Sequence, residues 1–219
     1  MIYLSQLVLD PRSRQVRSEV GDPYQMHRTL SKAFGDGPRA FDAARPLFRV
    51  DERRDGSLQL LVQSLTRPDW SRVEERQTYL TEPPKLKELK EPDALFRVGR
   101  RLRFRLRANP TVRRIFERAS GSESKQTGKR IGVYKEEAQR KWLDAKAEKA
   151  GFRVLDCRVA DRGFLVSRKP CCDKPIRHLC VDFEGILEIT DPSCFLTALE
   201  SGIGSAKGFG FGLLSVARA

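Results

Sequence analysis

The fold class is decided by the stretch Leu47-Phe-Arg-Val-Asp-Glu-Arg-Arg-Asp-Gly-Ser-Leu-Gln-Leu-Leu-Val-Gln-Ser-Leu65. Its apolar ends, residues 47–50 and 58–65, predict two strands, and the polar segment 52–56 between them has the composition of a hairpin turn. Upstream, residues 2–9 are apolar on both faces, as is typical of a central strand. A strand followed by a helix and a hairpin indicates the α+β class.

The segment between the first strand and the hairpin is polar at first and then carries strong helix signals. Asp22 is suited to cap a helix, Pro23 suits its first position, and Gln25 completes a variant capping box. We expect this helix to run to about Phe34 and to stop before the turn sequence that begins at Gly35.

Downstream of the hairpin, the signals are weaker but complete one structural unit. A short helix over 69–76 and a strand near Tyr79 give the order β-α-β-β-α-β, which is the ferredoxin-like unit. Residues 82–94 place three prolines among lysines and glutamates, which predicts a linker. The first domain is therefore expected to span residues 1–92.

Residues 93–219 repeat this order, so we predict two tandem ferredoxin-like domains. The long helix carries Ala138, Trp142 and Ala145 on one face and stops at Gly151. The predicted elements are a strand over 100–108, a mobile polar loop over 120–129, a helix over 135–150, strands near 152–159 and 179–190, a short helix over 191–202 and a last strand over 213–217.

Charge gives the first indication of function. The 219 residues carry 42 Lys and Arg against 29 Asp and Glu, a formal net charge of +13. A protein this basic usually binds a polyanion. Nucleic acid is the first candidate, and an anionic membrane surface is the second. No apolar run approaches the roughly 20 residues that cross a bilayer, and the first residues lack signal-peptide features. We therefore expect a cytoplasmic protein.

The cysteines and histidines do not form a metal-site pattern. The number of cysteines is odd and no Cys-x-x-Cys occurs, which is typical of reduced cysteines in a cytosolic protein. His27 and His178 are the only histidines, and their spacing disfavours a zinc site. The five cysteines are Cys157, Cys171, Cys172, Cys180 and Cys194.

The predicted strand in the stretch Arg100-Arg-Leu-Arg-Phe-Arg-Leu-Arg-Ala-Asn-Pro110 alternates apolar and basic residues. Strand side chains alternate between faces, so the two leucines and Phe104 join the core while four arginines share the other face. Such a row repels itself unless an anion is present, and guanidinium groups bind phosphate bidentately. The alternative is a solvated edge strand protected by charge. The predicted RNA-binding cations are Arg101, Arg103, Arg105, Arg107, Arg113, Arg114, Lys129 and Arg130, with Arg118 and Lys125 extending the charge.

A glycine-rich segment, Gly202-Ile-Gly-Ser-Ala-Lys-Gly-Phe-Gly-Phe-Gly-Leu-Leu-Ser215, suggests a nucleotide loop at first. A P-loop requires Ser or Thr after Gly-Lys, whereas Gly208 follows Lys207, and a dinucleotide fingerprint requires glycine in place of Lys207. The segment also follows a predicted helix and leads into a strand. We expect Lys207, Gly208 and Gly210 to lie against an RNA backbone, with a tight structural turn as the alternative.

The first helix presents two opposite stripes. Tyr24, His27, Arg28 and Ser31 follow i, i+3, i+4, i+7 spacing and share one face, which Lys32 flanks. The opposite face consists of Met26, Leu30, Ala33 and Phe34.

The polar stripe suits metal-free RNA cleavage. In that reaction the ribose 2′-hydroxyl attacks the adjacent phosphorus, and protons must leave this hydroxyl and reach the departing 5′-oxygen. A histidine near its reference pKa of about 6.5 exchanges protons at neutral pH. Tyr24 can orient a group, while Arg28 and Lys32 can neutralise charge on the phosphate.

Five stretches together resemble one family. The chain resembles the CasE family, the crRNA-processing endoribonucleases of the type I-E CRISPR Cascade complex, through matches in the same order along the chain. The stretches are Pro23-Tyr-Gln-Met-His-Arg-Thr-Leu30, Leu102-Arg-Phe-Arg-Leu-Arg-Ala-Asn-Pro110, Thr127-Gly-Lys-Arg130, Val181-Asp-Phe-Glu-Gly-Ile-Leu187 and the glycine-rich segment.

The resemblance implies both an activity and its partners. It implies metal-independent cleavage at the 3′ base of the CRISPR repeat hairpin, without a cofactor, leaving a 5′-hydroxyl and a cyclic phosphate. It also implies that the enzyme, a monomer when free, keeps the mature crRNA and joins other Cascade subunits. The family's catalytic histidine matches His27 and its active-site tyrosine matches Tyr24, while Arg28 and Lys32 match phosphate contacts. The resemblance does not account for Cys171-Cys172.

Two alternatives remain. A non-cleaving RNA-binding subunit would carry exposed aromatic residues for base stacking, as RNA-recognition modules do, whereas the predicted exposed strand face carries arginines. A nucleotide-dependent enzyme would use the glycine-rich segment to bind ATP or NAD.

Overall fold

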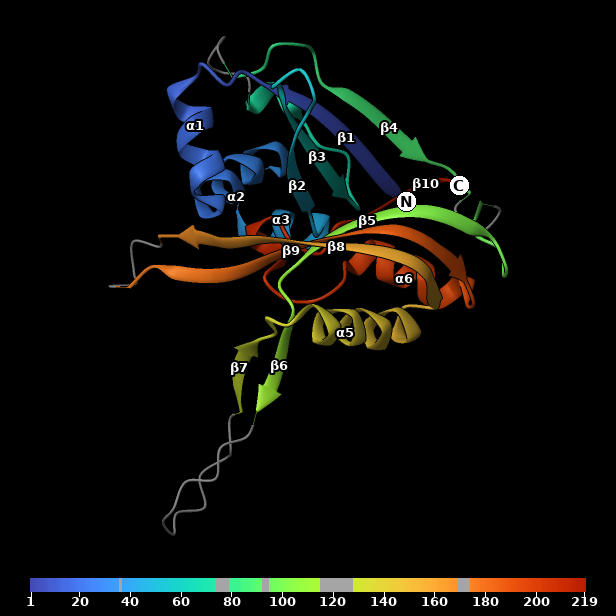
Figure 1. The fold of residues 1–219 in the computed structure, drawn as a ribbon. Helices are drawn as coiled ribbons and strands as arrows, with labels where there is room; N and C mark the ends of the chain where they lie inside the picture. Colours follow the sequence, from blue (N-terminus) through green and yellow to red (C-terminus); the bar gives the residue numbers. More distant parts are fainter. Residues whose placement is uncertain (36, 74–78, 92–94, 115–127, 169–173) are drawn as a thin grey trace.

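The chain folds into two four-stranded antiparallel sheets, one from each half of the sequence (Figure 1). The computed structural model describes residues 1–35, 37–73, 79–91, 95–114, 128–168 and 174–219. Both sheets place their first strand between their third and fourth strands, which is the ferredoxin-like order, so the predicted tandem fold is confirmed. The first sheet consists of β1 (Ile2–Leu9), β2 (Leu47–Glu52), β3 (Leu58–Ser64) and β4 (Lys85–Leu89), in the order β2-β3-β1-β4.

Helix α2 (Pro23–Ser31) begins where the sequence predicts, but its capping differs. Asp22 Oδ1 accepts a hydrogen bond from the Tyr24 backbone N–H at 3.0 Å. The predicted capping box is wrong, because the Asp22 N–H donates to the Ser18 carbonyl, which ends the preceding helix. That preceding helix, over residues 14–21, forms in the polar stretch between the first strand and Asp22, for which the sequence predicts no helix. The N-terminal helical segments are α1 (Arg14–Gly21), α2, the 3-10 turn η1 (Lys32–Phe34), α3 (Pro38–Ala44) and the 3-10 turn η2 (Trp70–Arg72).

The predicted linker over 82–94 is wrong in part, because it contains β4. This strand pairs with β1 from Ile2↔Leu89 to Gln6↔Lys85 and forms the sheet edge. Its lysines and glutamates resemble a linker because charge protects an edge strand from further pairing. The strand predicted near Tyr79 is only a single bridge, Leu9↔Leu80. The helix predicted over 69–76 is described only as η2 and residue 73, since 74–78 lie outside the described residues.

The second sheet carries two helices on its apolar face. Leu102, Phe104 and Leu106 are buried against these helices, as the alternating sequence predicts. Strands β8 and β9 are longer than expected and pair along most of their length. The elements are β5 (Arg101–Ala108), α5 (Glu136–Lys149), β8 (Phe152–Ser167), β9 (Ile176–Ile189), α6 (Pro192–Ser201) and β10 (Leu214–Arg218), with the sheet order β10-β5-β9-β8.

The buried face of α5 was predicted only in part. Trp142 is buried, but Ala138 and Ala145 are exposed, and Gln139 takes a core position instead. Gln139 can be buried because its side-chain amide donates to the Val133 and Tyr134 carbonyls at 3.0 and 3.2 Å. A polar residue whose hydrogen bonds are satisfied does not disturb a core.

A second hairpin, β6 (Thr111–Arg114) with β7 (Lys129–Gly132), projects below α5 (Figure 1). The sequence prediction missed it. Of the polar loop predicted over 120–129, the structure describes only residues 128 and 129, and Lys129 opens β7. Residues 115–127 lie outside the described residues.

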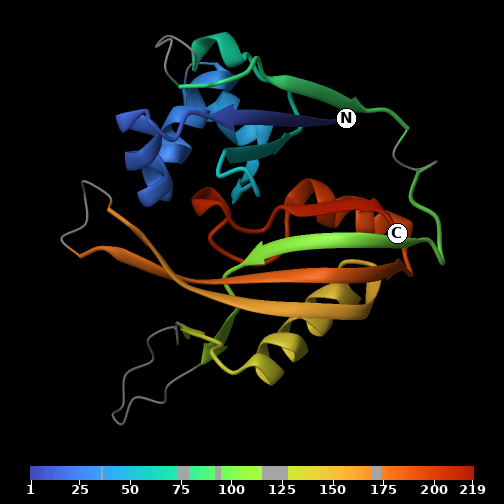
Figure 2. The ribbon, with the colours of Figure 1, turned by 45° about the horizontal axis from the view of Figure 1, so that its top comes forward.

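The two domains lie one above the other (Figure 2) and are joined by buried polar contacts. Arg49 on β2 is 2% exposed and donates to the carbonyls of Arg105 and Leu213 in the second domain, at 3.3 and 3.4 Å. In return, Arg107 donates to the Val50 carbonyl at 2.7 Å. Each domain thus supplies a guanidinium group to the other's backbone. None of the described helices has the length and apolar character needed to cross a bilayer.

Candidate functional site

Helix α2 and the 3-10 turn η1 that continues it hold the candidate catalytic residues in the predicted arrangement. Tyr24 and His27 are partly exposed, and Arg28 and Lys32 are exposed. The opposite stripe, consisting of Met26, Leu30, Ala33 and Phe34, is buried in the first domain's core. The core therefore fixes the orientation of the helix and turns its polar stripe outward.

His27 lies against the glycine-rich segment of the other domain. A Cβ atom added at Gly208 would lie 3.3 Å from His27 Nδ1, so the 3-10 turn η3 (Lys207–Phe209) approaches the imidazole ring closely. On another side, the His27 ring meets the Phe41 ring edge-on at 4.6 Å between centroids. The ring is thus held between the two domains, at a place where only glycine fits without displacement.

A shallow depression of about 480 Å³ opens beside His27. Lys32 brings a cation to it, while the Ser31 hydroxyl is engaged with the His27 carbonyl at 2.8 Å. Phe41 and Asp42 also line it, and the sequence prediction missed both because it missed α3. A depression that combines a histidine and a lysine has the features needed to hold a phosphodiester.

The glycine-rich segment follows α6 and leads into β10, as predicted. Nucleotide loops instead join a strand to a following helix, so this order disfavours that alternative. Lys207 is partly buried, and burial together with the charges of Arg45 and Lys146 lowers its pKa. A nearby anion would favour the charged form of Lys207.

His178 lies on the other side of the same turn, so the two histidines of the chain flank η3. The His178 ring contacts the Phe209 ring at 4.6 Å between centroids, and His178 Nδ1 lies 3.3 Å from Asn109 Nδ2. The Ser205 hydroxyl donates to the Asn109 carbonyl at 3.3 Å. This network ties the turn to β9 and to the end of β5. The sequence prediction gave His178 no role, although Asn109 and Ser205 both lie in stretches that carry the resemblance.

The arginines of β5 occupy one face, but the protein itself supplies much of their counter-charge. Arg101 pairs with Glu188 at 3.2 Å, and Arg107 pairs with Asp182 at 2.7 Å. Arg105 lies 2.9 to 3.4 Å from carboxylates of both domains, namely Asp51, Asp182 and Glu184. These carboxylates therefore supply much of the negative charge that the sequence analysis expected from a bound anion. Arg103 is exposed and donates to the Arg218 carbonyl at 3.1 Å.

Asp182 is the centre of this ion-pair cluster. Burial opposes its ionisation, but a hydrogen bond from Arg107 and the charges of Arg107, Arg105 and Arg162 outweigh burial. The pKa of Asp182 consequently lies below its ordinary value. This cluster joins β5 and β9 to Asp51 on β2, so it contributes to the domain contact.

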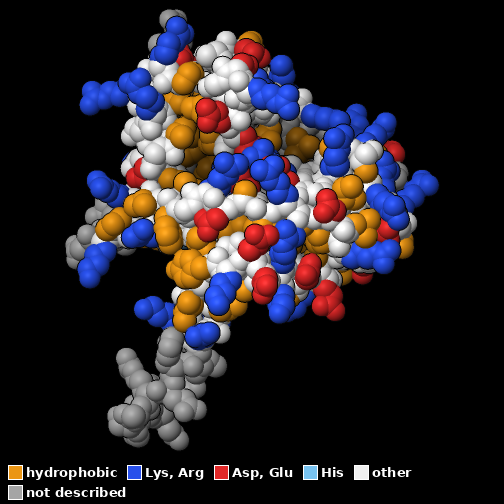
Figure 3. Space-filling view, viewed as in Figure 1, with side chains coloured by type: hydrophobic (Ala, Val, Ile, Leu, Met, Phe, Trp, Pro, Cys, Tyr) orange, Lys and Arg blue, Asp and Glu red, His pale blue; other side chains and the backbone are white. Residues whose placement is uncertain are grey.

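For the cations of the β6–β7 hairpin, the described part of the chain shows no ion pair with an acidic side chain. The hairpin's exposed residues Arg113 and Arg130 face each other across the ladder, as do Arg114 and Lys129. Like charges directly opposite each other destabilise a strand pair, which is typical of a surface that binds an anion. Figure 3 shows basic side chains near the base of this hairpin and over much of the visible face. Arg118 and Lys125 lie outside the described residues.

Together, the fold and the site define a basic, tandem ferredoxin-like protein with a histidine held between its two domains. The chain belongs to the family described as "CRISPR associated protein", whose profile matches residues 2–218. The resemblance to CasE proteins is thereby confirmed. Within the parts of the chain that are described, no group of three His, Cys, Asp or Glu residues is placed to hold a metal ion.

Two curated relatives match this chain over nearly its full length. It is 36% identical to the "CRISPR-associated endoribonuclease Cse3" of Thermus thermophilus over 99% of this chain and 100% of that protein. It is 33% identical to the "CRISPR system Cascade subunit CasE" of Escherichia coli K12, with 99% of both chains covered.

Solved structures have the same fold. Thermus thermophilus Cse3 bound to an RNA that represents a pre-cleavage complex matches with a TM-score of 0.79 and 37% identity, over 99% of this chain and 98% of that one. Cas6e from Escherichia coli K-12 matches with a TM-score of 0.68 and 26% identity, with both chains fully covered.

Proposed function

We propose that this protein is a metal-independent endoribonuclease that cuts CRISPR repeat RNA at the base of its hairpin. The observation that carries the proposal is the position of His27, which a buried helix face turns towards a glycine turn of the other domain. Membership in a family with a relative named endoribonuclease Cse3 supports it, as does the fold shared with RNA-bound Cse3.

The proposed reaction uses side chains of α2 together with Lys32, the first residue of η1. The 2′-oxygen forms a bond to phosphorus while the bond from phosphorus to the 5′-oxygen breaks. A proton leaves the 2′-hydroxyl and a proton reaches the departing 5′-oxygen, so the products are a 2′,3′-cyclic phosphate and a 5′-hydroxyl. His27 exchanges protons, Tyr24 orients the reacting groups, and Arg28 and Lys32 neutralise charge on the phosphate.

We assign RNA binding to two surfaces, the glycine turn η3 beside His27 and the exposed cations of the second domain. At the first, Lys207 and Gly208 lie against the RNA backbone, whereas Gly210, also predicted to do so, is buried against the Phe48 ring. At the second, the cations of the β6–β7 hairpin (Arg113, Arg114, Lys129 and Arg130) contact phosphates, with Arg101 and Arg103 at the sheet. The internal ion pairs of Arg105 and Arg107 favour a structural role for these two residues in place of the RNA contact predicted for them.

The proposed biological setting follows from the relatives. The N-terminal domain, residues 1–92, carries the catalytic helix, and the C-terminal domain, residues 93–219, carries the glycine turn and the basic hairpin. The division falls within residues 92–94, outside the described residues. We propose that the protein is monomeric when free, cytoplasmic and without a cofactor. It keeps the mature crRNA and enters Cascade with it, as the name of the relative CasE suggests.

Labelled repeat RNA tests the activity directly. We expect cleavage in the presence of EDTA, one cut at the 3′ base of the hairpin, and a product that ends in a cyclic phosphate. A single 2′-deoxy nucleotide on the 5′ side of the scissile phosphate removes the nucleophile and should block cutting. If the deoxy substrate is cut, or if chelation stops the reaction, the 2′-hydroxyl mechanism is wrong. Tight binding without any cut would favour the non-cleaving RNA-binding subunit.

A further inference from the structure

We propose that Tyr134, Phe164, Val166 and Arg177 form a stacking platform for an unpaired base of the RNA that flanks the repeat hairpin. This inference rests on the proposed function, because it names a second place at which the same RNA is held. The four residues come from the end of the β6–β7 hairpin and from the projecting part of the β8–β9 hairpin.

The platform is an exposed apolar surface with a cation on it. Tyr134, Phe164 and Val166 are 60%, 43% and 36% exposed. The two aromatic rings lie 6.3 Å apart between centroids and are tilted by 54°. The Arg177 guanidinium lies 4.5 Å from the centre of the Phe164 ring. Exposed aromatic rings grouped in this way usually mark a binding surface.

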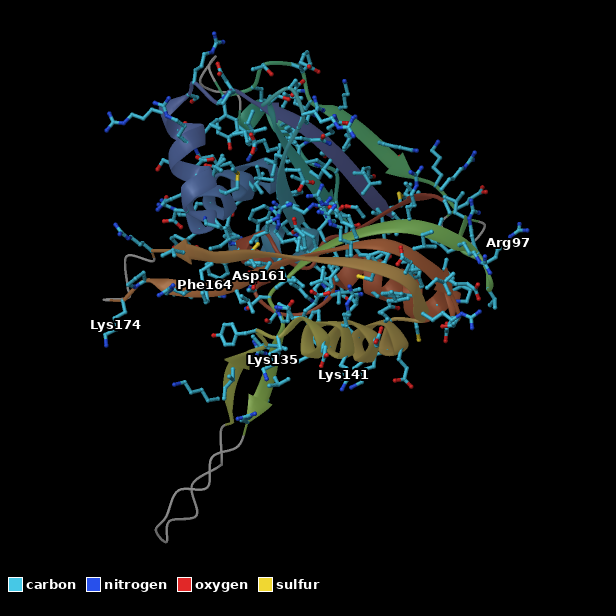
Figure 4. All side chains as sticks on the ribbon, viewed as in Figure 1. Arg97, Lys135, Lys141, Asp161, Phe164 and Lys174 are labelled. Atoms are coloured by element: carbon cyan, nitrogen blue, oxygen red, sulfur yellow. The ribbon has the colours of Figure 1, made fainter. Side chains whose placement is uncertain are left out.

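The exposure arises because β8 and β9 run past the helices that cover their apolar face. Phe164 pairs across the ladder with Leu179, which is 4% exposed and belongs to the core. The next pair on the same face, Val166 with Arg177, has lost this cover. Figure 4 shows Phe164 on this projecting hairpin, near the end of the molecule where Lys135 precedes α5.

The platform and the candidate catalytic site lie against opposite faces of strand β9. Arg177 and His178 are consecutive on β9, so they point to opposite faces of the sheet. His178 contacts Phe209 of the turn that touches His27, while Arg177 covers Phe164. Since β8 is the edge strand, an RNA chain that leaves the His27 site can pass around this edge to reach the platform.

The surrounding charge favours RNA as the occupant. Tyr134 comes two residues after β7, whose hairpin exposes four cations, and Arg177 adds a fifth. The carboxylate of Asp161, the nearest acidic residue before Phe164 on β8, accepts a hydrogen bond from the Gly163 N–H at 2.7 Å. Single-stranded RNA sites combine a positively charged surface with aromatic rings on which bases stack, and the cations around the platform fit that combination. Bases within a duplex are already stacked, so an unpaired nucleotide must supply the free base face.

The test compares two RNAs that are both blocked by a 2′-deoxy nucleotide at the cut site. One is the hairpin with its single-stranded flanks, carrying 2-aminopurine in place of flanking bases in turn, and the other is the hairpin trimmed to its stem and the one nucleotide that follows the cut site. Variants are Tyr134→Ser, Phe164→Ser and the double variant. Leu155→Ser, at a similarly exposed apolar residue on β8, is the matched control.

We expect the flanked RNA to bind wild-type protein about tenfold or more tightly than the trimmed RNA, because stacking on an aromatic ring contributes that much per base. The double variant should lose this difference while binding the trimmed hairpin and melting like wild type. With wild-type protein, 2-aminopurine at the stacked position should change its fluorescence on binding.

Two results would overturn the platform. One is equal affinity of the double variant and wild type for the flanked RNA, which would leave the surface to a protein partner. The other is no fluorescence change at any flanking position with wild-type protein, a result that does not depend on the variants' folding. Failure of the proposed function would look different: either neither blocked RNA would bind tightly, or the unblocked flanked RNA would be bound by wild-type protein without being cut.

Discussion

At the scale of single residues, the site depends on the missing side chain of Gly208 as much as on the imidazole ring of His27. Gly208 contributes no side chain, and this lets the turn of one domain come against the histidine of the other. Helix periodicity predicted the face that holds Tyr24 and His27, because i, i+3 and i+4 spacing is local. His178 was not predicted, since its contacts to Phe209 and Asn109 join segments that are distant in the sequence.

The exchange of His27→Ala should slow single-turnover cleavage by about 10² to 10⁴-fold, the usual contribution of general acid–base catalysis. Binding of the uncleavable hairpin should stay near the wild-type affinity, because cations elsewhere hold the RNA. Tyr24→Phe should cost less, since water can partly replace an orienting hydroxyl. A His27→Ala protein that cuts at the wild-type rate would remove His27 from the chemistry.

The exchange of Gly208→Val should impair both repeat binding and cleavage, because the new side chain meets the His27 ring and the space that we assign to the RNA backbone. Its melting temperature should change little, since the turn is at the surface. Gly21→Val is the control, because a Cβ atom at Gly21 would meet nothing within 4 Å. The steric argument fails if both variants have the same cleavage rate, measured at saturating enzyme.

At the scale of helices and strands, the sequence predicts what is apolar and periodic and misses what is charged or short. The hairpin of β2 and β3, the central strand β1 and the alternation of β5 were all predicted. Helix α1 and strand β4 were missed because both are rich in polar residues. Contacts with neighbouring elements stabilise both of them: β4 pairs with β1, and α1 buries Val16 and Glu19 in the core.

Substitutions of the β5 arginines should have two different effects, one on RNA binding and the other on stability. Arg103→Ser should weaken hairpin binding and reduce the slope of log affinity against log salt by about one, as expected for one lost phosphate contact. Arg105→Ser should chiefly lower the melting temperature, because it removes ion pairs that link Asp51 to Asp182. Salt titrations and melting curves of both variants make the comparison. An unchanged slope for Arg103→Ser would exclude Arg103 from the RNA interface.

At the scale of the whole molecule, the site exists only where the two domains meet. Arg49 and Arg107 each donate to the other domain's backbone, and Asp51 and Asp182 share Arg105 between the domains. In the sequence, the arginines of β5 are recognisable only as a row of like charges on one face of a predicted strand. Their partners could not be predicted, since Asp51 and Asp182 approach the row only once both sheets have formed and packed together.

This contact should be sensitive to acid. The folded-state pKa of Asp182 lies below 3.8, its ordinary value, so ionised Asp182 stabilises the fold above that pH. The stabilisation is lost as the pH falls through the lower, folded-state pKa. Asp182→Asn should therefore melt below wild type at pH 7, and this difference should shrink below about pH 4. A difference that stays constant down to pH 3 would contradict the role given to Asp182.

The position of the glycine turn has a consequence for protein synthesis. A ribosome delivers the chain from its N-terminus, and domains generally fold in that order. His27 is therefore made well before η3 and the strand β10 that anchors it. A growing chain still bound to its messenger RNA carries the histidine without the surface that completes the site. Under the proposed function, the nuclease stays inactive until η3 has been made and β10 (Leu214–Arg218) has joined the second sheet.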